Sequence, residues 1–192
     1  MKCLDYEGGL FSRISEDNVM ATKKLWIFSV ILAMCFVGIL AMQSFGELTD
    51  RQLSLNEINS VYIFIQGFTE ETSKAGLQKK AIQDYVEAKL KGAGIKSVSE
   101  EEGNKLEGRP VLYVNISARK RENSAVFVYH LDVGLLQETV LIRDESIHCM
   151  STTWNRGSLG YCTSRSLAKS IRGTVGYLMD KFVSDHKRAN LE

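Results

Sequence analysis

Two cysteines, Cys149 and Cys162, are the residues of this sequence best suited to covalent chemistry. They lie at equal distances on either side of Asn155-Arg156, so a hairpin turning there would set them opposite each other. We therefore predict a disulfide between them. One alternative is that the two cysteines are buried and unpaired. The other is a reactive thiol, because His148 adjoins Cys149 and Cys162 precedes a predicted helix start. Neither cysteine belongs to a Cys-x-x-Cys motif, which favours the structural bond.

The same predicted turn carries side chains that are typical of protein interfaces. Trp154, Asn155 and Arg156 form the turn, and Tyr161 and Arg165 follow closely in the sequence. Aromatic and arginine side chains dominate the binding energy of many interfaces. We predict a partner-binding surface at these five residues. The alternative is that Trp154 simply covers the edge of the core.

No group of residues predicts catalysis, a metal site or a cofactor site. His130 and Asp132 share one face of a predicted strand, but no third ligand is nearby and zinc needs three or four. Ser164 is not part of a Gly-x-Ser-x-Gly elbow. The glycine-rich stretch 157–160 lacks the lysine and the strand–helix context of a phosphate-binding loop. We expect no catalytic residue, no metal and no cofactor.

These candidate residues must be positioned by elements that the apolar spacing indicates. Two segments carry apolar residues at helical spacing and predict helices. Others are rich in β-branched and aromatic residues or alternate apolar with polar residues, and predict strands. The predicted helices are 75–91 and 164–190, and the predicted strands are 60–66, 95–99, 111–117, 125–142 and a hairpin of 148–154 with 157–162.

The order of these elements predicts an α+β fold. Both helices need a surface on which to bury their apolar stripes, and the sheet provides it. We predict a two-layer sandwich with a mixed or mostly antiparallel sheet of about four to six strands and two helices on one face, preceded by an amino-terminal hydrophobic helix. The first strand–helix–strand unit is expected to form a parallel pair.

A hydrophobic segment, residues 25–42, predicts the location of the domain. It contains no charged residue, and Lys23 and Lys24 precede it. This asymmetry places the amino-terminal side in the cytoplasm. The segment is either a signal peptide cleaved between Gly46 and Glu47, or an uncleaved single-pass anchor, which its length favours. In both cases the domain lies in the periplasm or on the periplasmic face of the inner membrane.

The chain accordingly divides into four parts. Residues 1–19 are acidic, which is unusual ahead of an export signal, and Met20 begins a compact basic stretch. We expect residues 1–19 to be a non-native or disordered leader, 20–46 the signal or anchor, 47–59 a tether and 60–190 a single globular domain.

Four stretches carry a resemblance to known proteins. They are 61–66 (VYIFIQ), 76–98, 110–117 (PVLYVNIS) and 152–186, which begins TTWNRGSLGY. The chain resembles an uncharacterised family of short exported bacterial proteins. Its order of elements also resembles the amino-terminal domain of the Tol-system periplasmic propeller protein and the lipoproteins that activate peptidoglycan synthases. The resemblance implies a protein partner in the cell envelope, although this chain lacks a lipoprotein cleavage box.

Charge narrows the class of partner. The chain has 24 Lys and Arg against 23 Asp and Glu, and this balance gives no support for nucleic acid as a partner. We expect an envelope binding or adaptor domain without catalysis, tethered through residues 25–42, that binds a protein through its hairpin tip or a sheet edge. The alternative is a periplasmic thiol-dependent redox enzyme or sensor that uses Cys149 or Cys162.

Overall fold

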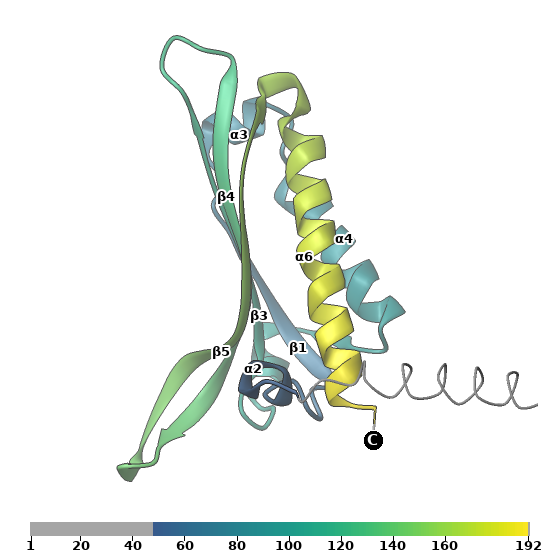
Figure 1. Cartoon of the computed structure of the whole chain (residues 1–192), viewed down its shortest axis with the longest axis vertical. Helices are drawn as coiled ribbons and strands as arrows, with labels where there is room; N and C mark the ends of the chain where they lie inside the picture. The colour runs from purple at the N-terminus through teal and green to yellow at the C-terminus, as the bar shows by residue number, and fades with distance from the viewer. Residues whose placement is uncertain (1–47, 192) are drawn as a thin grey trace, which may run out of the picture. The chain divides into compact units, whose positions relative to one another are not determined.

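A five-stranded mixed sheet organises the fold, with strand order β2-β1-β3-β4-β5 (Figure 1). The computed structural model describes residues 48–191. Its elements are α2 (Asp50–Leu53), β1 (Ser60–Gln66), α3 (Glu70–Lys74), α4 (Lys79–Gly92), β2 (Lys96–Val98), α5 (Glu100–Gly103), β3 (Val111–Lys120), β4 (Val126–Leu141), β5 (Asp144–Thr163), the 3-10 helix η1 (Ser164–Ser166) and α6 (Leu167–Ala189).

The sheet divides into a parallel and an antiparallel half. Strand β1 pairs in parallel with both β2 and β3, and β4 pairs antiparallel with β3 and β5. Helix α4 lies between β1 and β2 in the chain, as in the predicted strand–helix–strand unit. The α+β class, the mixed sheet and the number of strands are therefore confirmed.

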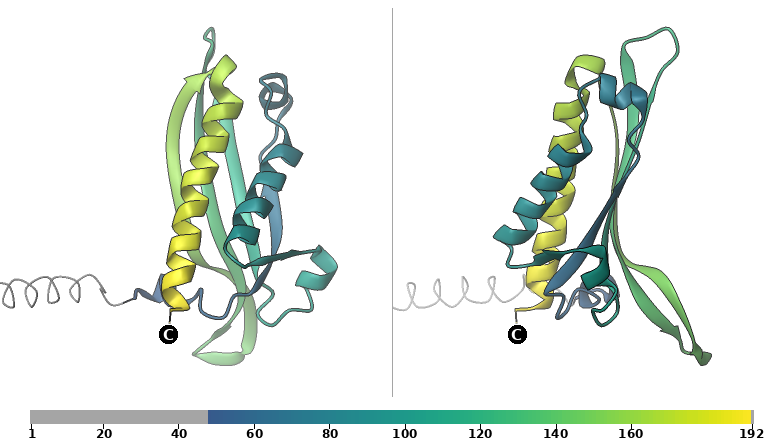
Figure 2. Two further views of the ribbon diagram at one scale, coloured as in Figure 1. Left: turned by 90° about the vertical axis from the view of Figure 1, so that its right-hand side faces the viewer. Right: turned by 180° about the vertical axis from the view of Figure 1, so that it is seen from behind.

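Helices α4 and α6 cover one face of the sheet, and most of the other face carries no helix (Figures 1 and 2). Alternate residues of β3, including Leu112 and Val114, point into the layer between sheet and helices and are buried. The apolar stripe of α6, which includes Ile171, Val175 and Phe182, packs onto the same layer. We call the uncovered side the open face of the sheet.

Strand β5 corrects the predicted hairpin. Residues 144–163 form one strand of 20 residues, and the chain does not turn at Asn155-Arg156. The turn lies instead at Ile142-Arg143, between β4 and β5. The lower halves of β4 and β5 project beyond the rest of the sheet as a two-stranded arm (Figure 1). We call residues 136–152 the arm.

A β-bulge separates the arm from the rest of β5. Leu135 pairs with Trp154 but Leu136 pairs with Thr152, so Thr153 is the extra residue. The bulge lies on β5, close to the residue that pairs with Gly134 of β4. Because one residue is inserted, side chains that alternate correctly above the bulge change phase below it.

Residues 48–59, which we expected to form a tether, belong to the same compact unit as the remainder of the domain. Helix α2 lies in this segment, and the Ser54 carbonyl accepts a hydrogen bond of 2.9 Å from the Gln137 side chain at the base of the arm. Residues 25–42 and the cleavage position at Gly46 and Glu47 lie outside the described residues. Between residues 48 and 191, no helix combines the length and the apolar character needed to cross a bilayer.

Gly67 ends β1 in a conformation that only glycine tolerates. Its φ is +96°, and a Cβ there would lie 1.8 Å from the carbonyl oxygen of Ile116 on β3. We expect Gly67→Ala to lower the free energy of unfolding by about 3 kcal/mol, because backbone strain and overpacking add together. Chemical denaturation measures this loss.

Gly76→Ala is the matched control for that substitution. Gly76 also has a positive φ, +84°, but nothing lies within 4 Å of the point that a Cβ would occupy. Only the backbone strain of about 1 kcal/mol should appear. Equal losses in the two variants would show that the contact with Ile116 does not constrain this turn.

Candidate binding surface

Trp154 is fully buried and belongs to the core, so its predicted role in a contact surface is wrong. Its ring packs edge-on against Phe182 of α6, with centroids 5.2 Å apart. Its indole Nε1–H donates a hydrogen bond of 3.0 Å to Oδ2 of Asp185. The alternative interpretation, that this tryptophan covers the edge of the core, is the one the structure supports.

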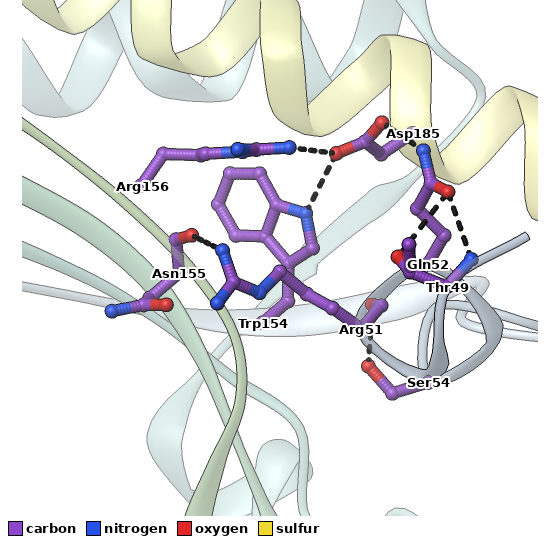
Figure 3. A network of polar contacts seen from close by, with 8 residues as sticks. All are labelled: Thr49, Arg51, Gln52, Ser54, Trp154, Asn155, Arg156 and Asp185. Atoms are coloured by element: carbon purple, nitrogen blue, oxygen red, sulfur yellow. Dashed lines mark hydrogen bonds and ion pairs between the residues drawn. The ribbon is translucent and has the colours of Figure 1, made fainter.

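Asp185 joins three separate parts of the chain (Figure 3). Its Oδ1 accepts a hydrogen bond of 2.7 Å from Nε2 of Gln52 on α2, and its Oδ2 accepts from Trp154. The Arg156 guanidinium lies 3.5 Å from Oδ2. Only 8% of Asp185 is exposed. These donors replace the water that the carboxylate loses on burial.

The ionised form of Asp185 is favoured by this environment. Burial by itself raises the pKa of the carboxyl, but hydrogen bonds from Gln52 and Trp154, together with the charge of Arg156, outweigh it. The pKa therefore lies below its ordinary value. Sequence reasoning missed this residue, although a signal exists: Asp185 continues the apolar stripe of α6, three residues after Phe182.

The predicted five-residue surface is divided between the two faces of β5. Trp154 and Arg156 lie on the helix-covered face, where both contact Asp185. Asn155 and Tyr161 alternate with them and lie on the open face. Arg165 lies beyond the strand in η1 and is exposed. Four of the five predicted residues are therefore exposed, but Arg156 is directed to the helix-covered face, and only Asn155, Tyr161 and Arg165 are left for a surface on the open face or at the end of β5.

The backbone of β5 has a free edge, because β5 is the last strand of the sheet. The Ser164 N–H donates 2.8 Å to the carbonyl of Ala125, which precedes β4, so Ser164 points toward β4. From Val126 to Leu135 the pairing with β5 continues without a register shift. In an antiparallel pair every second residue directs its N–H and C=O groups to the neighbouring strand. The even-numbered residues of this part of β5 therefore bond to β4, and the odd-numbered Gly157, Leu159 and Tyr161 direct these groups away from it.

Helix α2 marks the lower limit of this free edge. The Arg51 guanidinium donates a hydrogen bond of 3.2 Å to the Asn155 carbonyl, which is in the same phase (Figure 3). Above it, no hydrogen bond between described residues reaches the outward backbone groups of Gly157, Leu159 or Tyr161. We call residues 157–163 the upper edge.

The upper edge lacks the devices that normally prevent strand pairing. It contains no charged residue and no proline. Leu159 is 74% exposed and Tyr161 is 81% exposed, both on the open face. A Cβ at Gly157 would lie 2.6 Å from Oδ1 of Asp132, so a larger residue there would displace that side chain. An extended peptide could therefore add to this edge and contact two large side chains. That a sheet edge binds the partner stays a prediction. The sequence analysis did not identify Leu159 as part of this edge.

Cys149 and Cys162 do not meet. Both are free thiols and lie thirteen positions apart on the same strand, opposite Thr139 and Phe127 respectively. At the rise of an extended strand this separation is about 40 Å, whereas a disulfide requires Cα atoms within about 7 Å. The predicted hairpin is wrong, and the predicted disulfide is not formed in this structure.

Cys149 lies among hydroxyl groups on the arm. Its sulfur is 3.5 Å from Oγ1 of Thr139 and 3.6 Å from Oγ of Ser151. Hydrogen bonds from Thr139 and Ser151, and the nearby charge of Arg143, lower the pKa of this thiol. Cys162, by contrast, packs half-buried against the core.

His130 and Asp132 are in contact on the open face, with Nδ1 and Oδ2 3.1 Å apart. Within residues 48–191 no cluster of three or more His, Cys, Asp or Glu side chains is arranged to hold a metal ion. The expectation that the protein needs no metal or cofactor stays a prediction.

Comparison with known proteins gives no assignment. No protein family matches the sequence, and no curated protein matches it. A solved variant of the PelC dodecamer from Paraburkholderia phytofirmans is similar in structure at 16% identity and a TM-score of 0.42, covering 74% of this chain and 93% of that one. A second PelC dodecamer structure from the same organism gives 16% identity and a TM-score of 0.40, with 73% and 91% covered. A likeness of this size carries no argument about function.

Removing the charge of Asp185 tests its role. We expect Asp185→Asn to lower the free energy of unfolding by about 2 kcal/mol, because an amide turned toward the Trp154 and Gln52 donors leaves one of them unsatisfied. Asp180→Asn, on the same helix, is the control. This substitution breaks the ion pair of 2.6 Å between Asp180 and Lys89. Because the Asp180 carboxylate is mostly exposed, the free energy of unfolding should fall by less than about 1 kcal/mol.

The pH dependence of the same pair of proteins gives a second check. Because the folded pKa of Asp185 is depressed, its stabilisation is complete above the ordinary value of 3.8 and is lost as the pH falls through the folded pKa. The difference between wild type and Asp185→Asn should shrink below about pH 4. A difference that stays constant with pH would contradict the role of the ionised carboxylate.

Thiol labelling distinguishes the two described cysteines. We expect iodoacetamide to modify Cys149 faster than Cys162 in the native protein, because its thiolate is stabilised and its side chain is not packed in the core. Thr139→Val should slow the reaction at Cys149 by removing a hydrogen bond. Mass mapping without reductant measures both, and a Cys149–Cys162 bridge in native protein would contradict the strand register.

Proposed function

We propose that this chain is a non-catalytic binding domain of the bacterial cell envelope that recruits an extended segment of another envelope protein to the upper edge of β5. The incoming segment adds a sixth strand to the sheet. Its main chain pairs with the outward groups of Gly157, Leu159 and Tyr161, and its side chains contact Leu159 and Tyr161 on the open face.

The observation that carries this proposal is the coincidence of free backbone and exposed apolar side chains on the same residues. Leu159 and Tyr161 direct unpaired N–H and C=O groups outward, and they are also among the most exposed large apolar side chains of the domain. An edge of this kind normally carries a lysine, a proline or a covering loop. On the same edge, Arg51 covers the carbonyl of Asn155, but no hydrogen bond between described residues covers the groups above it.

The proposed location is the periplasm or the periplasmic face of the inner membrane. The uncharged segment 25–42 and the two lysines before it support export of the domain with the amino terminus in the cytoplasm. Export of the domain supports an envelope protein as the partner. The domain then presents its edge to other proteins of that compartment.

A thiol-dependent role is the second candidate, and one observation favours it. Hydrogen bonds from Thr139 and Ser151 lower the pKa of the Cys149 thiol. The nearest described cysteine is far along the same strand, so this candidate is a single-thiol sensor rather than a dithiol enzyme. A Cys149→Ser variant that loses its function in cells but still captures a partner at the upper edge would favour the single-thiol sensor over the binding domain.

Photo-crosslinking in intact cells tests the binding domain. A benzoylphenylalanine at position 161 should crosslink to a partner protein, and the same residue at Tyr177 on α6, which is also exposed, should not form that adduct. Leu159→Pro should abolish the adduct at 161, because proline removes one outward N–H and its ring obstructs an added strand.

Two further variants separate the backbone from the side chain. Leu159→Ala should retain most of the adduct, because its N–H remains. Ser158→Pro should unfold the domain at lower temperature than Leu159→Pro does, because the Ser158 N–H belongs to the ladder with β4. A folded Leu159→Pro protein that still forms the adduct at 161 would overturn strand addition.

A further inference from the structure

The end of the arm carries exposed apolar side chains. Ile142, at the turn, is 98% exposed, and Val140, Ile147 and Met150, farther along the same two strands, are 45%, 41% and 41% exposed. The arm consists of two strands with no second layer packed on its end, so these residues cannot be buried in a hydrophobic core. Apolar residues gathered at a protruding tip mark a contact with another apolar phase.

The described chain begins at the base of this arm. Helix α2 starts at Asp50, and the Gln137 side chain bonds the Ser54 carbonyl just after that helix ends. Figure 1 shows α2 and the arm at the same end of the domain, while the β3–β4 connection and the start of α6 lie at the opposite end.

The chain is short enough between residue 42 and α2 for the tip of the arm, at Ile142, to reach a bilayer that contains residues 25–42. Five residues, 43–47, separate that segment from Leu48 and can span at most about 17 Å. From Gln137 to Ile142 at the turn the chain advances five residues, which extend about 17 Å beyond α2. A bilayer that contains residues 25–42 is therefore close enough to α2 for the arm to reach its surface.

We propose that the apolar tip of the β4–β5 arm inserts into the interface of the bilayer that anchors residues 25–42. The proposal rests on the location given under the proposed function, with residues 25–42 kept as the uncleaved single-pass anchor that their length favours. The domain is then attached to the bilayer at two points, through residues 25–42 and through the tip of the arm. Two attachments prevent free rotation of the domain about residues 43–47. The upper edge of β5 is then held on the side of the domain that faces away from the lipid.

The chemistry of the tip indicates which lipids suit it. Arg143 lies at the turn, and Asp144 and Glu145 follow it, so the tip carries no excess of positive charge. The Asp144 carboxylate already accepts hydrogen bonds from the Ser146 backbone and hydroxyl. Insertion is therefore driven by the apolar side chains and should proceed on zwitterionic lipid, unlike that of basic peripheral proteins.

Depth-dependent quenching tests this in the full chain, reconstituted in phosphatidylcholine vesicles with and without brominated acyl chains. The protein carries Trp26→Phe and Ile142→Trp, and Trp154 stays as a buried internal reference. We expect brominated lipid to remove most of the emission of a tryptophan at 142. Leu159→Trp in the same background should lose none, because that position lies on the upper edge.

A second probe guards against a tryptophan that inserts by its own preference for the interface. With Ile147→Trp as the reporter, Ile142→Asp should abolish quenching, because it places a charge at the tip. The domain should stay folded, since Ile142 is exposed at the turn. Quenching at 147 that survives Ile142→Asp would overturn insertion of the tip. Quenching that requires added phosphatidylglycerol would overturn the apolar mechanism.

The native Trp26, inside residues 25–42, reports the anchor separately. If Trp26 is quenched and position 142 is not, the tip proposal fails and the anchor stands. If Trp26 is not quenched, the anchor fails and takes the tip proposal with it, while partner capture at the upper edge is still measured by crosslinking. A blue-shifted but unquenched tryptophan at 142 would overturn lipid contact in favour of a second copy covering the tip.

Discussion

The buried carboxylate of Asp185 links parts of this domain that are distant in sequence. It accepts hydrogen bonds from α2 and from β5 while it belongs to α6. A charge in such a position is stable only when several donors are present at once. The need to supply those donors fixes Trp154 toward the helices and brings α2 against the base of the arm.

The orientation of β5 follows from this interaction. Because Trp154 and Arg156 point to Asp185, the residues between and after them must point to the open face. The exposed positions of Leu159 and Tyr161 are therefore set by a contact on the opposite side of the strand. The binding surface depends on the core in this way, although no core residue forms part of it.

The elements with strong periodicity could be predicted from sequence. The stripe of α6 and the alternation of β4 each depend on apolar contacts that recur along one element, and these patterns appear directly in the residues. The short helix α3 was not predicted, because it depends on a local cap, in which the Thr69 side chain accepts from the Thr72 N–H, rather than on a long apolar stripe.

The hairpin at Asn155-Arg156 could not be corrected from sequence, because local turn preference and a long-range contact disagree there. Asn and Gly are common turn residues, but the ladder with β4 and the contact of Arg156 with Asp185, 29 residues away, keep this segment extended. The bulge at Thr153 also interrupts the alternation, so the 20-residue strand resembles two short ones. The free edge depended in turn on strand order, which residue patterns do not specify.

That bulge has an evolutionary consequence. Above the bulge, packing against α6 constrains the direction of the side chains. Below it the alternation is shifted by one residue, and the arm contacts a helix, α2, at its base. Loss or gain of one residue at Thr153 would exchange the two faces of the arm while the core kept its register. The arm can therefore diversify as an appendage, under selection for what it touches, without risk to the fold that carries it.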